Sequence, residues 1–334
     1  MARQIAIVTP VLDDWESFTA LVTEISERFA GADVAFHVCA LDDGSVAPLD
    51  ANRLKFPADT PIANVEVIRL AVNLGHQRAI AVGLCAIAER DDIDAVLVMD
   101  SDGEDRPADI AALLAASERQ PDHVVFAHRA KRSEGPTFKL CYFIYKLLFR
   151  VFTGHAISFG NYVLIPRAAV ARLVHMPELW NNFAAAIMRS RLRYTTVETE
   201  RGTRYAGRSR MSLTGLVVHG LSAVSVYSDV VFVRVLIATF FVGVLAMAGI
   251  LAVTAIRFAS SLAIPGWATA AAGDLLIVLL QTVVIMVATA LTMLAGRSAR
   301  PMVPIVDCRL FVTRRQQCWI RPADLQPVLM RAIR

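Results

Sequence analysis

The chain has 334 residues, of which 55% are hydrophobic and 19% charged, and its formal net charge is +4. This apolar content excludes a chain that is disordered throughout, and the length exceeds that of one small domain. Five scattered cysteines without a CxxC pair argue against a zinc site or a disulfide framework. The mild positive charge gives no reason to expect a nucleic-acid partner.

The first 230 residues alternate short apolar runs with segments of helical spacing. Strands separated by helices of 10–15 residues favour an α/β fold with a mostly parallel sheet and helices on both faces. Ligands of such sheets bind beyond the carboxyl ends of the strands, where this sequence places its polar clusters. The predicted strands cover residues 5–9, 34–41, 65–70, 95–99 and 123–127, and the predicted helices cover residues 14–30, 77–88 and 107–117.

The most strongly acidic cluster covers residues 100–105 and follows a predicted buried strand. Its alternating carboxylates repel one another unless a cation lies among them, and hard oxygen ligands suit Mg²⁺ or Mn²⁺. Such an ion would bridge the protein to a diphosphate and neutralise charge on a departing nucleotide. The alternative is a solvated acidic turn in which Asp105 helps to cap the following helix.

Three further clusters follow other predicted strands, at residues 9–14, 42–45 and 73–78. The carboxylates of residues 42–45 could accept hydrogen bonds from a base or a ribose, or they could form an ordinary turn. His76 is expected to begin the next helix, and we do not assign it a catalytic role. Because parallel strands end at one edge of a sheet, these clusters are expected on the same rim as residues 100–105.

Basic residues form a second set, at residues 128–132 and 201–210. Between them, residues 138–152 interleave Lys139, Lys146 and Arg150 with aromatic and aliphatic residues, which is typical of an interfacial amphipathic helix. Arginine forks bind phosphate in a bidentate manner, so the pattern indicates a phosphate site at a bilayer surface. Plain attraction to lipid headgroups is the alternative.

Two uncharged runs of 22 residues, 235–256 and 275–296, predict transmembrane helices. At ~1.5 Å per residue each run spans about 33 Å, enough for the hydrocarbon core of a bilayer. Buried helices of a soluble domain are the alternative. The N-terminus does not have the pattern of a signal peptide, and residues 297–334 contain eight arginines and two acids. The positive-inside rule therefore predicts that both large segments are cytoplasmic.

These motifs together make residues 4–230 resemble glycosyltransferase family 2. Within that family they are similar to membrane-anchored polyprenyl-phosphate glycosyltransferases such as dolichol-phosphate mannose synthases and bacterial undecaprenyl-phosphate glucosyl- and aminoarabinosyl-transferases. The matching segments are residues 9–14 for TPxYNE, 42–45 for DDGS, 73–83 for NxGxxxAxxxG, 99–107 for MDADLQDPP and 204–210 for RxxGxSK.

The resemblance implies a GT-A fold, Rossmann-like with a mostly parallel sheet, that binds a nucleotide-diphosphate sugar, with a UDP-sugar favoured. Asp14 and Asp43 would lie near the nucleoside, and Pro10 and Asn73 would belong to the same nucleotide site. Asp100, Asp102 and Glu104 would surround Mg²⁺ or Mn²⁺, with Glu104 in the family's usual glutamine place. The residues expected to face donor or acceptor phosphate are Arg129, Lys139, Arg201, Arg204 and Arg210, and those expected to be catalytic are Asp100, Asp102 and Arg129.

The domain organisation expected on this basis has four parts. Residues 1–135 would form the nucleotide-sugar-binding core, and residues 136–230 the acceptor side with interfacial helices. Residues 231–296 would form a two-helix transmembrane hairpin, and residues 297–334 a basic cytoplasmic tail. That tail could pack on a neighbouring subunit, so a homo-oligomer is among the expected assemblies.

The expected function is an inverting transfer of a sugar to polyprenyl phosphate at the cytoplasmic face of the inner membrane, by a multi-pass protein anchored in the bilayer. Thirty arginines against four lysines indicate a GC-rich bacterial genome, which favours undecaprenyl phosphate. A processive polysaccharide synthase is one alternative, although residues 316–319 lack the spacing of a QxxRW segment. A catalytically silent membrane scaffold that binds nucleotide sugars is the other.

Overall fold

The computed structural model describes residues 2–129, 146–155, 160–207, 213–259 and 266–324. The chain divides into two units. One unit comprises residues 1–145, 156–226 and 302–334, and the other comprises residues 146–155 and 227–301. The predicted site residues Lys139 and Arg210 lie outside the described residues.

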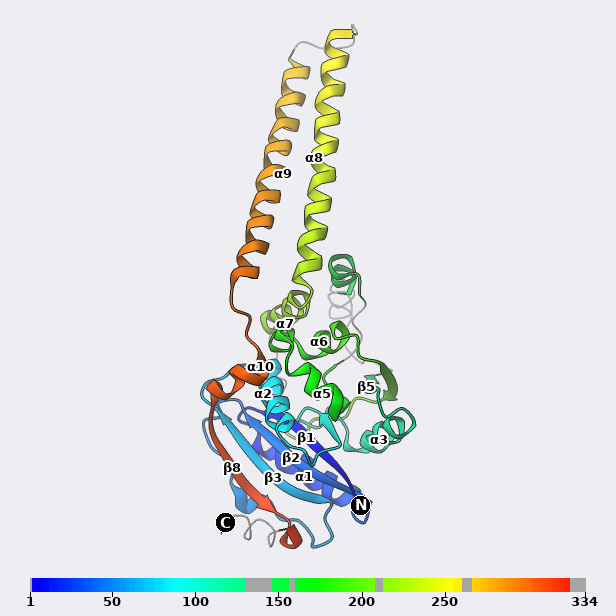
Figure 1. Ribbon diagram of the computed structural model, residues 1–334, viewed down its shortest axis with the longest axis vertical. Coiled ribbons are helices and arrows are strands. Elements are labelled where there is room, and N and C mark those ends of the chain that lie inside the picture. Colours follow the sequence, from blue (N-terminus) through cyan, green and yellow to red (C-terminus); the bar gives the residue numbers. More distant parts are fainter. Residues whose placement is uncertain (1, 130–145, 156–159, 208–212, 260–265, 325–334) are drawn as a thin grey trace. The chain divides into compact units, whose positions relative to one another are not determined.

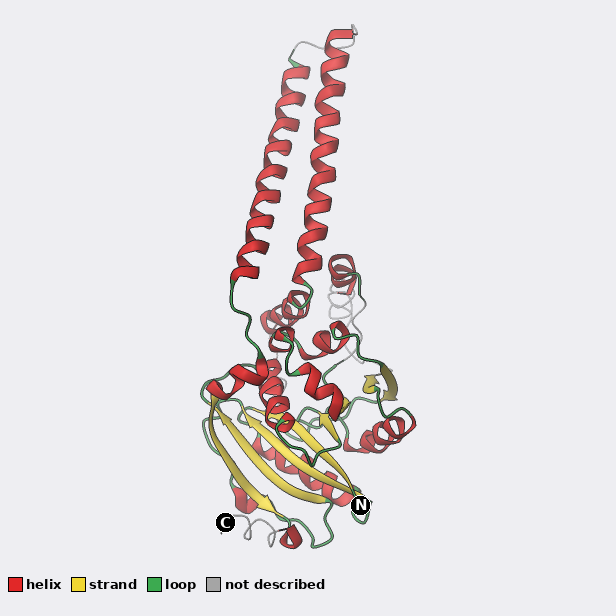
Figure 2. Ribbon diagram, in the orientation of Figure 1, coloured by secondary structure: helices red, strands yellow, loops and turns green. Residues whose placement is uncertain are grey.

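Within the described residues, the first unit is built on an eight-stranded sheet in the order β7-β5-β6-β4-β1-β2-β3-β8 (Figures 1 and 2). β1 pairs in parallel with β2 and β4, β2 with β3, and β5 with β7, whereas β6 and β8 run antiparallel to their neighbours. The strands are β1 (Arg3–Val11), β2 (Val34–Asp42), β3 (Ile62–Leu70), β4 (Ala95–Val98), β5 (Val124–Arg129), β6 (Val163–Pro166), β7 (Tyr194–Thr199) and β8 (Val312–Ile320). This mostly parallel α/β sheet confirms the predicted fold class.

Helices cover both faces of the sheet because successive strand residues point to opposite sides. On β1, Ile5 and Ile7 pack in the core that contains α1 and α3, whereas Ala6 and Val8 pack in the core that contains α2, α5 and α6. All four side chains are fully buried. The helices of this unit are α1 (Trp15–Arg28), α2 (His76–Ala88), α3 (Ile110–Arg119), α5 (Arg167–Leu173), α6 (Phe183–Arg189), α7 (Leu213–Ser225) and α10 (Pro304–Asp307).

Helix α2 lies directly against the centre of the sheet. A Cβ atom on Gly83 would lie 2.5 Å from Cγ1 of Val8 and 2.7 Å from Cδ2 of Leu41. Since no real Cβ contact is that short, the glycine sets how closely the helix approaches the strands. This close packing fixes the N-terminus of α2, which begins at His76, at the carboxyl ends of the strands.

Strand β8 has no counterpart among the elements predicted from the sequence. Residues 312–320 belong to the segment predicted as a basic tail, yet they pair antiparallel with β3 and form an edge of the sheet. Trp319 packs edge-on against Phe56 with ring centroids 4.8 Å apart, and Arg309 donates to Glu89 at 2.8 Å. The chain after the long apolar helices therefore returns to the sheet-containing unit.

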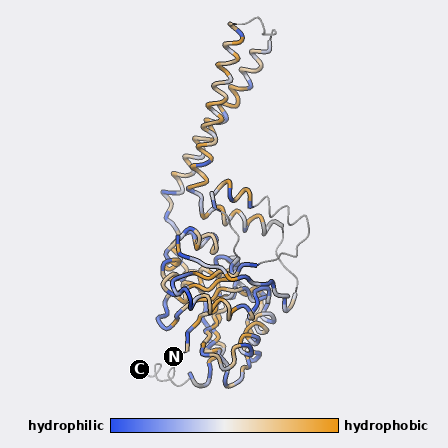
Figure 3. The backbone as a smooth tube through the Cα atoms, turned by 90° about the vertical axis from the view of Figure 1, so that its right-hand side faces the viewer, coloured by the Kyte–Doolittle hydropathy of each residue, from blue (hydrophilic) through white to orange (hydrophobic). Residues whose placement is uncertain are grey.

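The second unit contains two long helices, α8 (Ser228–Ala259) and α9 (Trp267–Ser298). Both are long and apolar enough to cross a membrane, and only 11% and 6% of their most apolar windows are buried. Their hydrophobic character runs along most of their length (Figure 3). The two helices pack together where Gly249 faces Leu275 and Gly243 faces Thr282. In the same unit, residues 146–153 are helical, which is the described part of the predicted amphipathic helix.

Candidate functional site

The predicted clusters of residues 9–14, 42–45 and 73–78 do meet at one edge of the sheet. Asp43, which is 4% exposed, accepts hydrogen bonds from the backbone N–H groups of Leu74 at 2.7 Å and Gly75 at 3.0 Å. Burial raises the pKa of Asp43 above its ordinary value, and these two hydrogen bonds oppose that rise. The carboxylate thus joins the end of β2 to the loop that precedes α2.

A cavity of ≈ 160 Å³ opens beside this junction. It is smaller than the ~300–1,000 Å³ of typical ligand pockets, so it fits part of a ligand, such as a base or a ribose. Its lining includes three predicted nucleotide-site residues, and the full set is Pro10, Val11, Leu12, Asp43, Asn73, Gly75 and His76. A hollow of ≈ 430 Å³ lies along α1, but none of the predicted site residues lines it.

Asp14 lies near these residues in sequence but has a local structural role. It is the N-cap of α1, where its side chain accepts from the N–H of Ser17 at 3.4 Å. An aspartate at this position satisfies one of the free N–H groups of the first helical turn. The predicted contact of Asp14 with a nucleoside stays a prediction.

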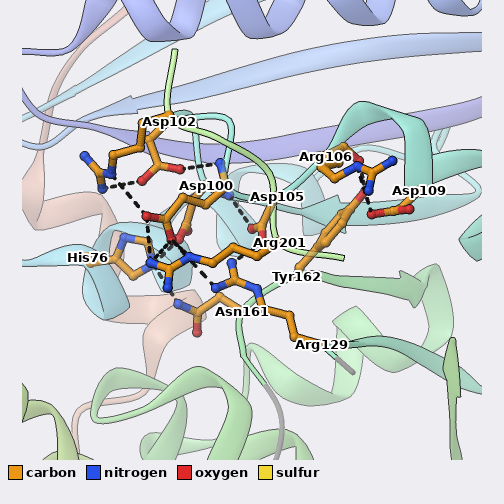
Figure 4. Close-up of polar contacts among 12 residues, drawn as sticks. His76, Asp100, Asp102, Asp105, Arg106, Asp109, Arg129, Asn161, Tyr162 and Arg201 are labelled. Carbon is orange, nitrogen blue, oxygen red and sulfur yellow. Dashed lines mark hydrogen bonds and ion pairs between the residues drawn. The ribbon is translucent and has the colours of Figure 1, made fainter. Parts of the chain in front are cut away.

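The acidic loop after β4 is organised by a carboxylate other than the predicted ligands. Asp105 is 3% exposed, and it accepts from the N–H of Asp100 at 2.9 Å and from Nη2 of Arg129 at 2.9 Å (Figure 4). Burial, followed by the charge of Asp100, raises the pKa of Asp105 to about 7. Burial, followed by the charge of Asp102, raises the pKa of Asp100 to about 7 as well.

Asp100 has the features of a cation ligand. Its side chain is 33% exposed, but Oδ1 is buried and has no hydrogen-bond partner among the described residues. The neighbour of this oxygen is Nε2 of His76 at 3.2 Å, and that nitrogen already accepts from Nδ2 of Asn161 at 2.8 Å. Burial lowers the pKa of His76, so the ring is neutral near pH 7. An oxygen that faces a lone pair and lacks a donor suits a divalent cation.

The orientation of His76 is set by a chain of amide groups. The backbone N–H of Phe183 donates to Oε1 of Gln77 at 2.7 Å, which makes Nε2 of Gln77 the donor to Oδ1 of Asn161 at 3.1 Å. Nδ2 of Asn161 then donates to His76. Because a backbone N–H can only donate, this chain fixes both amide orientations and leaves Nε2 of His76 as an acceptor.

The other two predicted metal ligands are paired with arginines. Arg201 donates to both carboxylate oxygens of Glu104, at 2.9 Å from Nη2 to each, and Arg204 donates to Glu104 at 3.2 Å. Arg204 also pairs with Asp102, and Nη1 of Arg129 lies 3.7 Å from Glu104. Burial opposes ionisation of Glu104, but these arginines outweigh it and hold the pKa of Glu104 below its ordinary value.

The acidic and basic sets that the sequence predicts separately therefore form one cluster in the structure. Within the described parts of the chain, no group of three acidic, histidine or cysteine side chains converges as metal ligands would. The shared cation of Asp100, Asp102 and Glu104 stays a prediction. Sequence reasoning missed Gln77, Asn161 and the organising role of Asp105, because their partners lie in distant segments or depend on the shape of the loop.

Comparisons with known proteins identify the family of the chain. The family model described as "Glycosyl transferase family 2" matches residues 6–173, which is about half of the chain. The undecaprenyl-phosphate 4-deoxy-4-formamido-L-arabinose transferase of Yersinia pestis (strain Pestoides F) is 26% identical over 226 residues, and the match covers 64% of this chain and 64% of that protein. The protein of the same name from Yersinia enterocolitica is also 26% identical over 226 residues. The match thus spans less than two thirds of the length of these relatives.

Solved structures with a similar fold include glucosyl-3-phosphoglycerate synthase from Mycobacterium tuberculosis, in complex with Mn²⁺, UDP-glucose and phosphoglyceric acid. Its TM-score is 0.49 at 15% identity, and the match covers 69% of this chain and 80% of that one. Mannosyl-3-phosphoglycerate synthase from Rubrobacter xylanophilus has a TM-score of 0.48 at 15% identity, with 68% and 73% covered.

Proposed function

Because the chain belongs to glycosyl transferase family 2, we propose that it transfers a sugar from a nucleoside diphosphate sugar to a polyprenyl phosphate. The observation that carries this proposal is the cluster at the carboxyl end of β4. There, Asp102 and Glu104 pair with three arginines. Asp100 lies 3.2 Å from His76, which lines the same cavity as Asp43. The Yersinia relatives are named for transfer to undecaprenyl phosphate, which is the acceptor that we favour.

The donor side of the site would hold the nucleoside. Asp43 and Asn73 line the small cavity with Pro10, and they supply carboxylate and amide oxygens that can accept from a base or a ribose. A UDP-sugar is the donor we favour. Its diphosphate would extend from this cavity toward the loop that begins at Asp100.

Asp100, with its buried unpartnered oxygen, and Asp102 would hold Mg²⁺ or Mn²⁺, and Glu104 would contribute from the same loop. When bound, this ion neutralises charge on the departing diphosphate. The residues of the chain align the two substrates, and the buried Asp105 keeps Arg129 in place through their hydrogen bond of 2.9 Å.

The acceptor phosphate would be held by Arg129, Arg201 and Arg204. A phosphate oxygen attacks the anomeric carbon while the bond from that carbon to the diphosphate oxygen breaks, and the nucleoside diphosphate leaves with the electron pair. Attack from the opposite face inverts the configuration. Because a phosphate monoester is already ionised near pH 7, the reaction does not need a general base, and alignment and charge stabilisation supply the catalysis.

Helices α8 and α9 would anchor the protein in the inner membrane, with the sheet-containing unit and the C-terminal residues on the cytoplasmic side. Large apolar side chains of α8, including Phe240, Phe241 and Leu245, are more than half exposed, and a bilayer would cover them. Arg257 is the one basic residue between the two predicted spans, whereas arginines are frequent after residue 297. That distribution follows the positive-inside rule.

A second candidate is a protein that binds nucleotide sugars without turnover. The observation that favours it is the pairing of Asp102 and Glu104 with arginines, since paired carboxylates are not free to hold a cation. The other alternative, a processive polysaccharide synthase, would be recognised by a product that carries many sugar units.

The proposal is tested with full-length protein in detergent, undecaprenyl phosphate, Mn²⁺ and a panel of sugar nucleotides. We expect lipid-dependent release of a nucleoside diphosphate, and we expect Asp102→Asn to lower turnover on the order of a hundredfold or more. Asp122→Asn is the matched control, because Asp122 is exposed in a turn away from the cluster. Nucleotide binding without release would favour the second candidate, and unchanged turnover in Asp102→Asn would remove the proposed metal role.

A further inference from the structure

The segment after β7 lies directly on the acidic loop after β4. The N–H of Gly202 donates to the carbonyl oxygen of Glu104 at 2.9 Å, and the N–H of Tyr205 donates to that of Asp102 at 2.9 Å. A Cβ atom on Gly202 would lie only 2.0 Å from the carbonyl oxygen of Gly103. Residues 201–205 are therefore in tight backbone contact with residues 102–104, and this contact fixes where Arg201 and Arg204 can reach.

At this contact, Arg201 and Arg204 bind the carboxylate of Glu104 in the way that arginines bind an oxyanion. Arg201 presents Nε at 3.1 Å and Nη2 at 2.9 Å to one oxygen of Glu104, while Arg204 presents Nε at 3.2 Å to the other. Glu104 is 16% exposed, so both guanidinium groups converge on a mostly buried carboxylate. The guanidinium fork binds carboxylate and phosphate with the same geometry. Glu104 thus occupies the position that a phosphate group would take between these arginines.

Asp102 connects this arrangement to the expected cation. Arg204 pairs with Asp102 as well as with Glu104, and the N–H of Glu104 donates to Oδ1 of Asp102 at 2.9 Å. A divalent cation and a guanidinium group repel each other when they share one carboxylate. The arginines and a cation therefore compete for Asp102 and Glu104.

We propose that Glu104 holds Arg201 and Arg204 as an internal substitute for phosphate, and that cation binding at the acidic loop releases both arginines to a phosphate group of a substrate. This inference rests on the proposed function, in which both a cation and a phosphate visit the site. It predicts an order of binding: the cation binds first and prepares the arginines. By linkage, a bound phosphate strengthens cation binding by the same factor.

The phosphate could be the diphosphate of the donor or the monoester of the acceptor. Two probes distinguish them: UDP, and farnesyl phosphate, which is a soluble prenyl phosphate. Their affinities for the full-length protein in detergent are measured by calorimetry with and without Mn²⁺, and Mn²⁺ affinity is measured by electron paramagnetic resonance. The probe whose metal-free affinity changes in the variants below is the one that the arginines bind.

Two variants test the competition between the arginines and the cation from its two sides. Glu104→Gln removes the internal anion, so metal-free affinity for the phosphate probe should rise on the order of tenfold, and Mn²⁺ should then add little. Arg201→Gln removes a competitor for Glu104, so Mn²⁺ affinity without phosphate should rise several-fold. The matched controls are Glu200→Gln and Arg106→Gln, which break a neighbouring ion pair. Both controls should leave the two affinities close to those of the wild type.

If Glu104 had a purely structural role, Glu104→Gln would loosen the segment. The metal-free affinity for phosphate would then fall instead of rising. Weaker or unchanged metal-free binding of both probes to that variant would overturn the inference, and so would unchanged Mn²⁺ affinity in Arg201→Gln. Failure of the proposed function looks different: the wild-type protein would bind neither probe or would form no glycolipid. A wild-type protein that forms glycolipid but shows no coupling refutes this inference alone.

Discussion

Replacing Gly202 with alanine should remove most of the turnover and lower the free energy of unfolding by at most about 3 kcal/mol. The new Cβ would lie 2.0 Å from the carbonyl oxygen of Gly103 and 2.8 Å from Cγ of Arg106. Non-bonded heavy atoms prefer separations of about 3.5–4.0 Å, so residues 201–205 must move by about 1 Å or more. Gly103 has a φ of +90°, which glycine adopts readily, and a Cβ on it would lie 2.8 Å from the ring of Tyr205, so its loop is packed too closely to follow easily.

The size of the effect follows from the contacts that this movement breaks. The backbone hydrogen bonds of Gly202 to Glu104 and of Tyr205 to Asp102 contribute about 0.5–1.5 kcal/mol each, so the loss of stability is at most about 3 kcal/mol. Because Arg201 and Arg204 move with the segment, a displacement of about 1 Å should lower turnover on the order of a hundredfold.

The assay compares turnover with undecaprenyl phosphate and thermal unfolding of the same preparation. Gly273→Ala is the control, because a Cβ on Gly273 of α9 would meet nothing within 4 Å. It should behave like the wild type in both measurements. Near-normal turnover in Gly202→Ala would refute the reasoning, since it would mean that the position of the arginines does not matter for transfer.

Three further predictions concern the fold. Gly83→Ala should lower the free energy of unfolding by about 1–3 kcal/mol in denaturant titration, since its Cβ would lie 2.5 Å from Cγ1 of Val8; an unchanged midpoint would contradict the close packing of α2. Burial lowers the pKa of His37 below 6.5, so the folded protein binds a proton at this ring less readily than the unfolded chain does. The protein therefore loses stability as the pH falls through 6.5. His37→Gln should flatten this pH dependence in melting curves recorded between pH 5 and 7. Trp319→Ala should cost roughly 1–3 kcal/mol, less than the ~3–5 kcal/mol of a fully buried tryptophan, and a wild-type melting temperature would mean that β8 does not stabilise the sheet.

The sequence predicts the central strands well because burial on both faces makes them continuous apolar runs. β4 (Ala95–Val98) is an example, and the acidic residues that follow it mark the carboxyl edge of the sheet. β8 gives no such signal: as an edge strand it carries Arg314 and Arg315 and is mostly polar. Only its pairing with β3 makes it a strand.

The sequence predicts where the candidate site lies, but it does not predict which of its charged residues form ion pairs with each other. Which carboxylate of residues 100–105 is buried depends on the turn at Gly103, and composition does not reveal that Asp105 is the one that receives Arg129. Glu104 and Arg201 are 97 residues apart, so their ion pair depends on the tertiary fold. A local pattern can name the charged groups, but it cannot say which of them neutralise each other.

Mass spectrometry of the lipid products tests the central claim most directly, namely that this chain joins a sugar to a prenyl phosphate. Full-length protein in detergent is incubated with a sugar nucleotide, undecaprenyl phosphate and Mn²⁺, and each component is omitted in turn. We expect one glycolipid that carries a single sugar, appears only in the complete mixture and disappears with a chelator. Nucleoside diphosphate release at the same rate without lipid, or a full yield of glycolipid from Asp102→Asn, would contradict it.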